Sequence, residues 1–140
     1  MRANQLFRAA SLALLVGLAS AVIVTAQAKT DEDYDKLMKG VGAANGVMRK
    51  ATEPDAQAAE ATKLVALFKD AQQFWSGRNN KEAADWAGTA MKHASSAEAA
   101  FKAKDAEAAA TALKELGSTC QTCHTKYRER TDTGYQIKKG

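Results

Sequence analysis

The 140-residue sequence contains a single proline, Pro54, and beyond its first 30 residues it has no runs of β-branched residues. Valine, isoleucine and threonine are enriched in strands, so their lack of clustering disfavours a domain built on β-sheets. Alanine is abundant instead, and alanine has the highest helix propensity. The composition therefore predicts a helical protein.

Cysteine and histidine are also scarce, with two of each: Cys120, Cys123, His93 and His124. A structural zinc site needs four ligands, and outside the stretch 120–124 only His93 remains to complete one. A redox Cys-x-x-Cys pair is expected in a βαβ context, which a helical chain lacks. Zinc binding and dithiol chemistry both fit this sequence poorly.

Three of these four residues form the run Cys120-Gln-Thr-Cys123-His124, which has the Cys-x-x-Cys-His spacing of a c-type haem attachment motif. Two thiols at this spacing can add across the two vinyl groups of one porphyrin edge, while the adjacent imidazole binds the iron. Positions i, i+3 and i+4 share one face of a helix, so a single turn can hold all three bonds. The motif predicts one covalently attached haem c, with Cys120 and Cys123 as thioether residues and His124 as a metal ligand.

The N-terminal stretch carries Arg2 and Arg8, an apolar segment over 12–24 and the small-x-small pattern Ala26-Gln-Ala28. These features predict a secretory signal peptide over residues 1–28, cleaved after Ala28. An uncleaved membrane anchor is disfavoured because the apolar segment is shorter than the roughly 20 residues that a spanning helix needs. Since c-type haem is attached outside the bacterial cytoplasm, the sequence predicts a periplasmic protein with no membrane insertion after cleavage.

The charge balance disfavours two classes of partner. The formal net charge is +4, and cleavage would remove two arginines and no acidic residue, which leaves +2. Two haem propionates would cancel that remainder. We therefore expect neither nucleic acid nor a membrane surface as a partner.

Four helices are predicted after the signal peptide, each starting at a recognisable signal. Thr30 and Asp33 form a loose capping box, Pro54 suits a first helical position, Asn79 with Glu82 resembles a second capping box, and Asp105 can cap the last helix. The expected helices cover 31–51, 54–76, 79–102 and 105–130. Short connections predict an antiparallel up-down-up-down four-helix bundle as one domain over 29–130, followed by a polar tail over 131–140 that frays.

Apolar residues recur at three- and four-residue steps along these helices. In the third helix the repeat is formed by Trp86, His93 and several alanines, and we expect the alanines to leave space for the haem. Trp75 and Trp86 flank the turn between the second and third helices. Core packing is the default for both tryptophans, and contact with the haem edge or with a second copy of the chain stays open.

The run from Cys120 continues through His124 to Tyr127 and Arg128, and its position near the C-terminus of a helical chain resembles the cytochrome c′ superfamily, or class II c-type cytochromes. That resemblance implies a left-handed antiparallel four-helix bundle with haem on the last helix. It also implies that Arg128 lies close to the proximal haem face. The competing interpretation of Arg128 is a surface cation near the end of a helix.

In this superfamily the residue opposite the proximal histidine comes from the first helix, which here offers Met38 and Met48. Met48 continues the apolar repeat of that helix and is expected to fill the core. Met38 lies nearer the mature N-terminus and is predicted to be the second iron ligand. Gly40, Gly42 and Gly46, costly inside a helix, indicate close approach of a porphyrin or of a partner helix.

A thioether ligand stabilises ferrous iron and suits an electron carrier. The sequence therefore predicts a non-enzymatic cytochrome that exchanges single electrons with redox partner proteins. The first competing prediction is a five-coordinate protein that binds NO or CO, with Met38 packing beside the iron. Two further competing predictions involve His93, either as the second iron ligand or as the acid–base group of a small peroxidase. A homodimer through the first and second helices, with Gly42 and Gly46 at the contact, also stays open.

Overall fold

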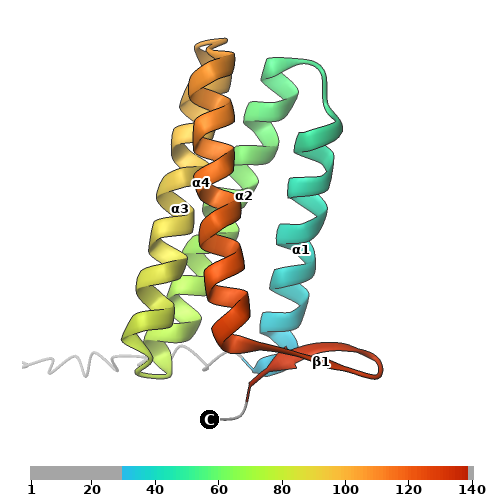
Figure 1. Ribbon diagram of the computed structural model, residues 1–140, viewed down its shortest axis with the longest axis vertical. Helices are drawn as coiled ribbons and strands as arrows, with labels where there is room; N and C mark the ends of the chain where they lie inside the picture. Colours follow the sequence, from blue (N-terminus) through green and yellow to red (C-terminus); the bar gives the residue numbers. More distant parts are fainter. Residues whose placement is uncertain (1–29, 139–140) are drawn as a thin grey trace, which may run out of the picture.

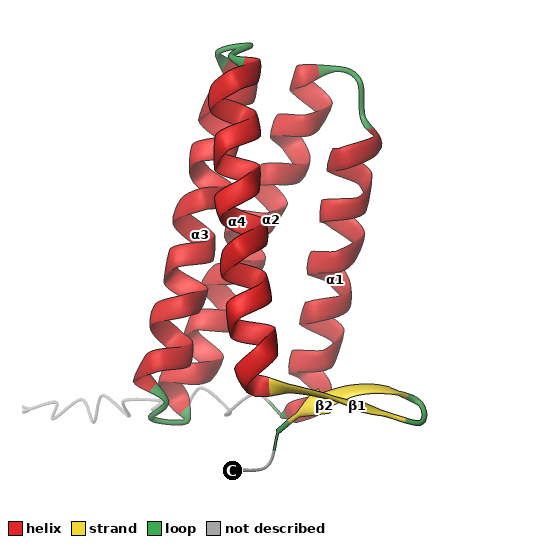
Figure 2. Cartoon of the chain, in the orientation of Figure 1, coloured by secondary structure: helices red, strands yellow, loops and turns green. Residues whose placement is uncertain are grey.

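The computed structural model describes residues 30–138, and Figure 1 shows four long helices joined by short loops. The elements are α1 (Asp31–Lys50), α2 (Pro54–Gly77), α3 (Lys81–Lys102), α4 (Ala106–Tyr127), β1 (Arg128–Thr131) and β2 (Gly134–Ile137). Consecutive helices run in opposite directions, and the two strands form a hairpin at one end of the helices (Figure 2). The described chain is therefore mostly helical, with the predicted antiparallel helices and an additional small sheet.

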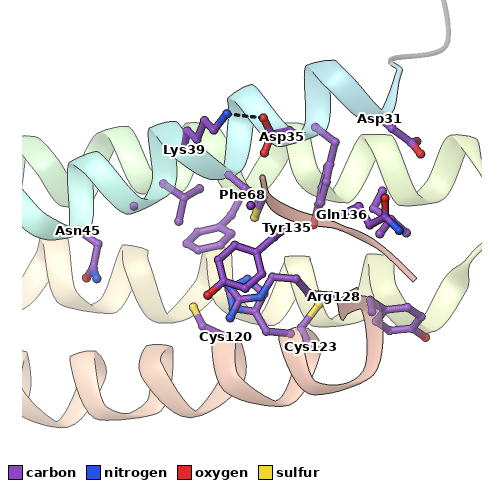
Figure 3. Close-up of a pocket in the computed structure, with 18 of the residues that line it drawn as sticks. Asp31, Asp35, Lys39, Asn45, Phe68, Cys120, Cys123, Arg128, Tyr135 and Gln136 are labelled. Carbon is purple, nitrogen blue, oxygen red and sulfur yellow. Dashed lines mark ion pairs between the residues drawn. The ribbon is translucent and has the colours of Figure 1, made fainter. Parts of the chain in front are cut away.

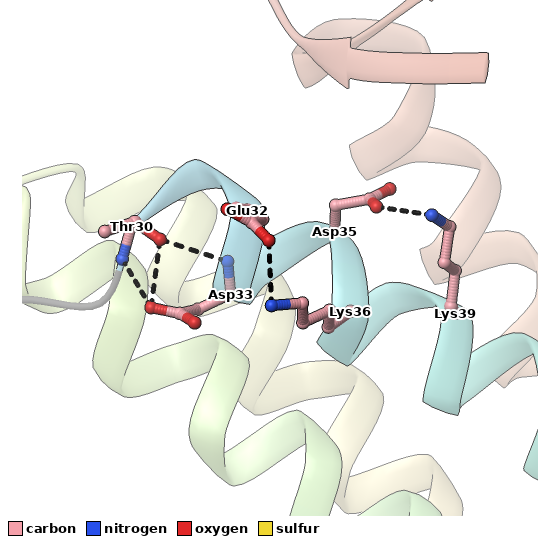
Figure 4. A network of polar contacts seen from close by, with 6 residues as sticks. All are labelled: Thr30, Glu32, Asp33, Asp35, Lys36 and Lys39. Carbon is pink, nitrogen blue, oxygen red and sulfur yellow. Dashed lines mark hydrogen bonds and ion pairs between the residues drawn. The ribbon is translucent and has the colours of Figure 1, made fainter. Parts of the chain in front are cut away.

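The start of α1 has the capping box that the sequence predicts (Figure 4). The Asp33 backbone N–H donates to the Thr30 hydroxyl at 3.2 Å, and the Thr30 backbone N–H donates to the Asp33 carboxylate at 3.0 Å. Two exposed ion pairs follow along the helix, Glu32–Lys36 at 2.9 Å and Asp35–Lys39 at 2.6 Å. Acidic side chains in the first turn also interact favourably with the positive end of the helix dipole. The capping box and these charges both act within one turn, so the start of this helix is determined locally.

The other helix starts are close to their predicted positions, with one correction. Pro54 is the first residue of α2, and the Asp105 carboxylate accepts the Ala108 N–H at 2.9 Å. The cap of α3, however, is Asn80, whose side chain accepts the Ala83 N–H at 3.0 Å. Asn79 has a φ of 56°, a left-handed conformation that asparagine tolerates well, so it turns the chain and leaves the cap to its neighbour.

Packing between the helices is uneven. Close backbone contacts join α1 to α2, α2 to α3 and α3 to α4, whereas α1 and α4 barely meet within the described residues. The face that α3 buries consists mainly of alanines, which allows its backbone to approach both neighbours closely. Met48 of α1 is fully buried in the main core, which confirms its predicted role as a core residue.

The chain after α4 differs from its prediction. Instead of a helix to Arg130 and a frayed tail, residues 128–137 form an antiparallel hairpin in which Arg128 pairs with Ile137 and Thr131 pairs with Gly134. Gly134 has a φ of 153°, which residues with a side chain rarely adopt. The Lys138 N–H donates to the Tyr127 carbonyl at 2.9 Å, and Ile137 packs against buried aromatic residues. These contacts hold the hairpin against the bundle and explain why the segment is ordered.

The predicted signal peptide over residues 1–28 lies outside the described residues. Among the helices of residues 30–138, none combines the length and the apolar character that a membrane span requires.

Candidate functional site

A cavity of about 680 Å³ lies between α1 and α4. Leu64, Phe68 and Trp75 of α2 form its floor, and residues of the hairpin close one end (Figure 3). Cofactor and ligand pockets are typically about 300–1,000 Å³ in volume, so this cavity is large enough for a ligand of that class. It occupies the one side of the bundle where two neighbouring helices do not pack together.

The α4 wall of the cavity carries Cys120, Cys123 and His124, all half-buried. Their positions i, i+3 and i+4 place them on one face of the helix, and Figure 3 shows both labelled cysteine side chains at the cavity. The threonines around them bond to their own helix: the Thr119, Thr122 and Thr125 hydroxyls donate to carbonyls four residues earlier at 2.8–3.0 Å. The polar neighbours of the motif are thus satisfied locally, and the two thiols and the imidazole face the cavity.

The electrostatics of this wall differ from those of a dithiol oxidoreductase. Burial raises the pKa of the Cys120 thiol, and it raises the pKa of Cys123 to about 11. A redox-active Cys-x-x-Cys pair needs a nucleophilic thiol with a lowered pKa, and both thiols here stay protonated at neutral pH. Burial and, secondarily, the Arg128 charge lower the pKa of His124. A neutral imidazole at this position has a free nitrogen lone pair for a metal ion.

The α1 wall carries Met38, which lines the same cavity as the two cysteines and His124. The structure thus brings Met38 and the α4 motif together, as the sequence predicts for a pair of ligands on opposite walls. Gly42 also lines this wall, and a Cβ built there or at Gly46 would meet nothing within 4 Å. No group of the described chain therefore requires glycine at either position.

His93 lies elsewhere. Its Nδ1 is 3.1 Å from a Glu115 carboxylate oxygen, which forms a contact between α3 and α4, and His93 does not line the cavity. The structure gives no geometric support to His93 as a second iron ligand or as a peroxidase acid–base group. Within residues 30–138, no group of three or more His, Cys, Asp or Glu side chains is arranged to hold a metal ion by itself.

Arg128 leaves the helix as the first residue of β1 and lines the cavity. Its guanidinium carbon lies 4.2 Å from the centre of the Tyr135 ring, which forms a cation–π contact across the hairpin. Arg128 is thus exposed to solvent and also borders the site, so it combines features of both predicted positions.

The second strand of the hairpin contributes residues to the site that sequence reasoning misses. Tyr135, Gln136 and Ile137 line the cavity, and Figure 3 shows the Tyr135 ring beside Cys120 and Arg128. A turn is the signal that could have revealed them: Asp132 and Thr133 separate two short segments, and the second begins at Gly134 and contains the strand-forming residues Tyr135 and Ile137.

The α3 alanines border less of the site than the sequence predicts. The main cavity is lined by α1, α2, α4 and the hairpin. Ala87 and Ala90 of α3 line an adjoining space of about 40 Å³, which also borders the Cys-x-x-Cys-His motif. The other buried alanines of α3 pack closely against α2 and α4. Trp75 is buried and lines the main cavity, whereas Trp86 is half-buried beside the smaller space.

The chemistry of the lining fits a covalently held haem. The floor and inner walls are apolar, through Val41, Leu64, Phe68 and Leu116. The rim carries charges of both signs: acidic residues of the first turns of α1 line it, Lys39 is paired with one of them, Asp35, and Arg49 and Arg128 add two further cations. Arg49 is oriented by the Asn45 side-chain oxygen, which accepts its Nε–H at 3.2 Å. An apolar ring with two carboxylates needs an apolar interior and cations at its edge, and the two arginines can provide these cations.

Comparisons with known proteins add no assignment: no protein-family model, no curated protein and no solved structure matches this chain.

Proposed function

We propose that this protein is a periplasmic monohaem c-type cytochrome that transfers single electrons, in which His124 and Met38 would hold the iron. One observation carries the proposal: Cys120, Cys123, His124 and Met38 line the same cavity, with the attachment motif on α4 and the thioether on α1. When bound, haem supplies one-electron chemistry by cycling between ferric and ferrous iron.

The residues of α4 would attach and ligate the group. Cys120 and Cys123 would each add a sulfur–hydrogen bond across one vinyl double bond, so that no atom is lost and no oxidant is needed. His124, with its lowered pKa, would donate an unprotonated ring nitrogen to the iron. The resemblance to the cytochrome c′ superfamily, which rests on the run from Cys120 to Arg128, agrees with this arrangement.

The residues of α1 and the rim would set the properties of the site. Met38 would donate a soft sulfur that favours the ferrous state and leaves no open position for NO or CO. Arg49 and Arg128 would provide cations for two propionates. The apolar floor would exclude water, which lowers the local dielectric and so favours the less charged redox state.

The test is the visible absorption spectrum of the purified holoprotein, oxidised, reduced, and reduced with CO. The proposal expects haem that stays with the denatured chain, low-spin bands, the weak long-wavelength sulfur-to-iron band in the oxidised state and no response to CO. A high-spin reduced spectrum that shifts with CO would instead assign the protein to the gas-binding class. A chain without covalent haem after expression with a haem-attachment system would end the proposal altogether.

A further inference from the structure

We propose that Trp75 and the two tyrosines that contact it position the ligand-bearing turns of α1 and α4 relative to each other. Tyr34, Trp75 and Tyr127 are called the aromatic bridge below. This inference rests on the proposed function, because it concerns how Met38 and His124 are held on opposite sides of the cavity.

The aromatic bridge connects two helices that otherwise barely meet. Tyr34 of α1 accepts the Trp75 indole N–H at 3.0 Å, and the two ring centres lie 5.4 Å apart in an edge-on arrangement. On its other side Trp75 contacts Tyr127 of α4, with ring centres 5.3 Å apart. Trp75 comes from α2, so it acts as a spacer between α1 and α4 at the closed end of the cavity.

The tyrosines of the bridge lie one helical turn from the two proposed ligands. Tyr34 precedes Met38 by four residues on α1, and Tyr127 follows His124 by three residues on α4. Residues at these spacings are neighbours on one helix face. A shift of either tyrosine would therefore be transmitted directly to the adjacent turn, and the separation of the two tyrosines sets the separation of the ligands.

Each member of the bridge is held by further contacts. The Tyr34 ring stacks on Phe74 with centres 4.3 Å apart, and the Tyr127 hydroxyl donates to the Glu82 carboxylate at 2.8 Å. Ile137 of the hairpin packs against the same buried cluster, so the hairpin reinforces this end. Aromatic side chains with fixed partners have few accessible rotamers, which is the property a spacer needs.

The remainder of the cavity has no comparable connection. Within the described residues, its α1 and α4 walls are separated by the space itself. On its inner side α1 packs against α2 and α3, because Leu37 is buried with Ala71 and Ala87. Met38 packs against the same cluster, which contains no residue of α4. Removing the aromatic bridge would leave these contacts in place and remove the link between α1 and α4, so the separation of these two helices should change.

The experiment compares the wild-type holoprotein with Trp75→Leu, Tyr34→Phe and the control Phe101→Leu. Phe101 is a buried core residue of α3 outside the aromatic bridge, so its truncation weakens the fold without touching the bridge. The readouts are the visible spectrum with and without CO, and the separation of α1 and α4 in crystal structures. Stability is followed in parallel by urea unfolding.

We expect Trp75→Leu to lose the sulfur-to-iron band, to bind CO in the reduced state and to change the α1–α4 separation. Tyr34→Phe keeps every ring and loses one hydrogen bond, so it should show a mixture of the ligated and open spectra. Phe101→Leu should lose stability and keep the wild-type spectrum. The same spectrum in all four proteins, with unchanged helix separation, would overturn the inference.

Failure of the inference and failure of the proposed function give different results. If the wild type binds CO or carries no haem, the proposed ligation is wrong, and the helix separation alone then decides whether the bridge is a spacer. Should Trp75→Leu fail to fold, Tyr34→Phe decides the question, because it preserves the packing volume. An unchanged spectrum and separation in Tyr34→Phe would then count against the bridge.

Discussion

Two sides of this bundle are built differently. Where α3 faces α2 and α4, its buried positions are mostly alanines, and three of its alanines are fully buried. Where α1 faces α4, the helices stand apart around a cavity with an apolar floor and a charged rim. Small side chains close one interface, whereas the other surrounds a cavity of about 680 Å³. This contrast separates the residues that make the fold from those that make the site.

The largest expected effect comes from removing the covalent attachment on the open side. The double substitution Cys120→Ser with Cys123→Ser should abolish haem retention in the denatured protein completely, because no thiol then remains for a thioether bond. Mass spectrometry and absorbance of the denatured chain check this. A matched pair on the closed side, Ser95→Ala with Ser96→Ala on exposed positions of α3, should retain all of the haem.

The two methionines of α1 allow a residue of the cavity wall and a residue of the core to be compared within one helix. Met38→Leu should open the sixth position and turn a CO-insensitive protein into one that binds CO, while changing the free energy of unfolding by less than about 1.5 kcal/mol. Met48→Leu lies in the closed core and should leave the spectrum unchanged at a similar cost in stability. CO titration followed by absorbance compares them. Equal CO responses of the two variants would remove Met38 from the ligand pair.

Enlarging a side chain should have opposite effects on the free energy of unfolding at the α3 interface and at the cavity. Ala94 is fully buried on α3, so Ala94→Leu should overpack that interface and lower the free energy of unfolding by about 1–3 kcal/mol or more, whereas Ala99→Leu on the exposed face should be nearly neutral. Gly42→Ala adds a methyl group where nothing lies within 4 Å and should raise stability by up to about 1 kcal/mol. Urea unfolding measures all three. A loss of stability in Gly42→Ala would show that a bound group lies against that glycine.

A pH effect is expected from the closed end of the cavity. Burial raises the pKa of Tyr34 to about 12 from its ordinary value of 10. Above pH 10 the unfolded chain loses this proton while the folded chain keeps it, so stability falls as the pH rises from 10 to 12. The loss attributable to Tyr34 over its whole titration is on the order of 3 kcal/mol. Urea unfolding between about pH 9 and 11 should show a shallower decline in Tyr34→Phe than in the wild type, and parallel declines would contradict it.

Local signals account for the helices, while the hairpin and the cavity depend on contacts distant in sequence. The capping box at Thr30, the proline at the first position of α2 and the cap at Asp105 act within one turn, so the helix starts follow from the sequence. The segment after Tyr127 is polar and aperiodic, and its order comes from Ile137 packing on aromatic residues of other elements. No local sequence pattern predicts that contact.

The candidate site divides in the same way. Spacing predicts the motif at Cys120, Cys123 and His124, and the resemblance together with the apolar repeat favours Met38 over Met48. The structure places the motif and Met38 around one cavity, and it places Met48 in the core. The floor from α2 and the Tyr135 and Ile137 side chains at the closed end could not be predicted. They reach the cavity only through the tertiary arrangement.

The open side has a consequence for how such a protein changes over evolutionary time. Met38 lines the cavity and packs only against the small cluster of Leu37, Ala71 and Ala87, so a substitution of similar volume at position 38 changes one cavity wall without changing the larger core between α3 and α4. The composition of this cavity wall and the stability of the fold are therefore encoded largely in separate sets of residues. Under the proposed function, a single nucleotide change at this codon would convert an electron carrier into a gas binder while the rest of the chain stays as it is.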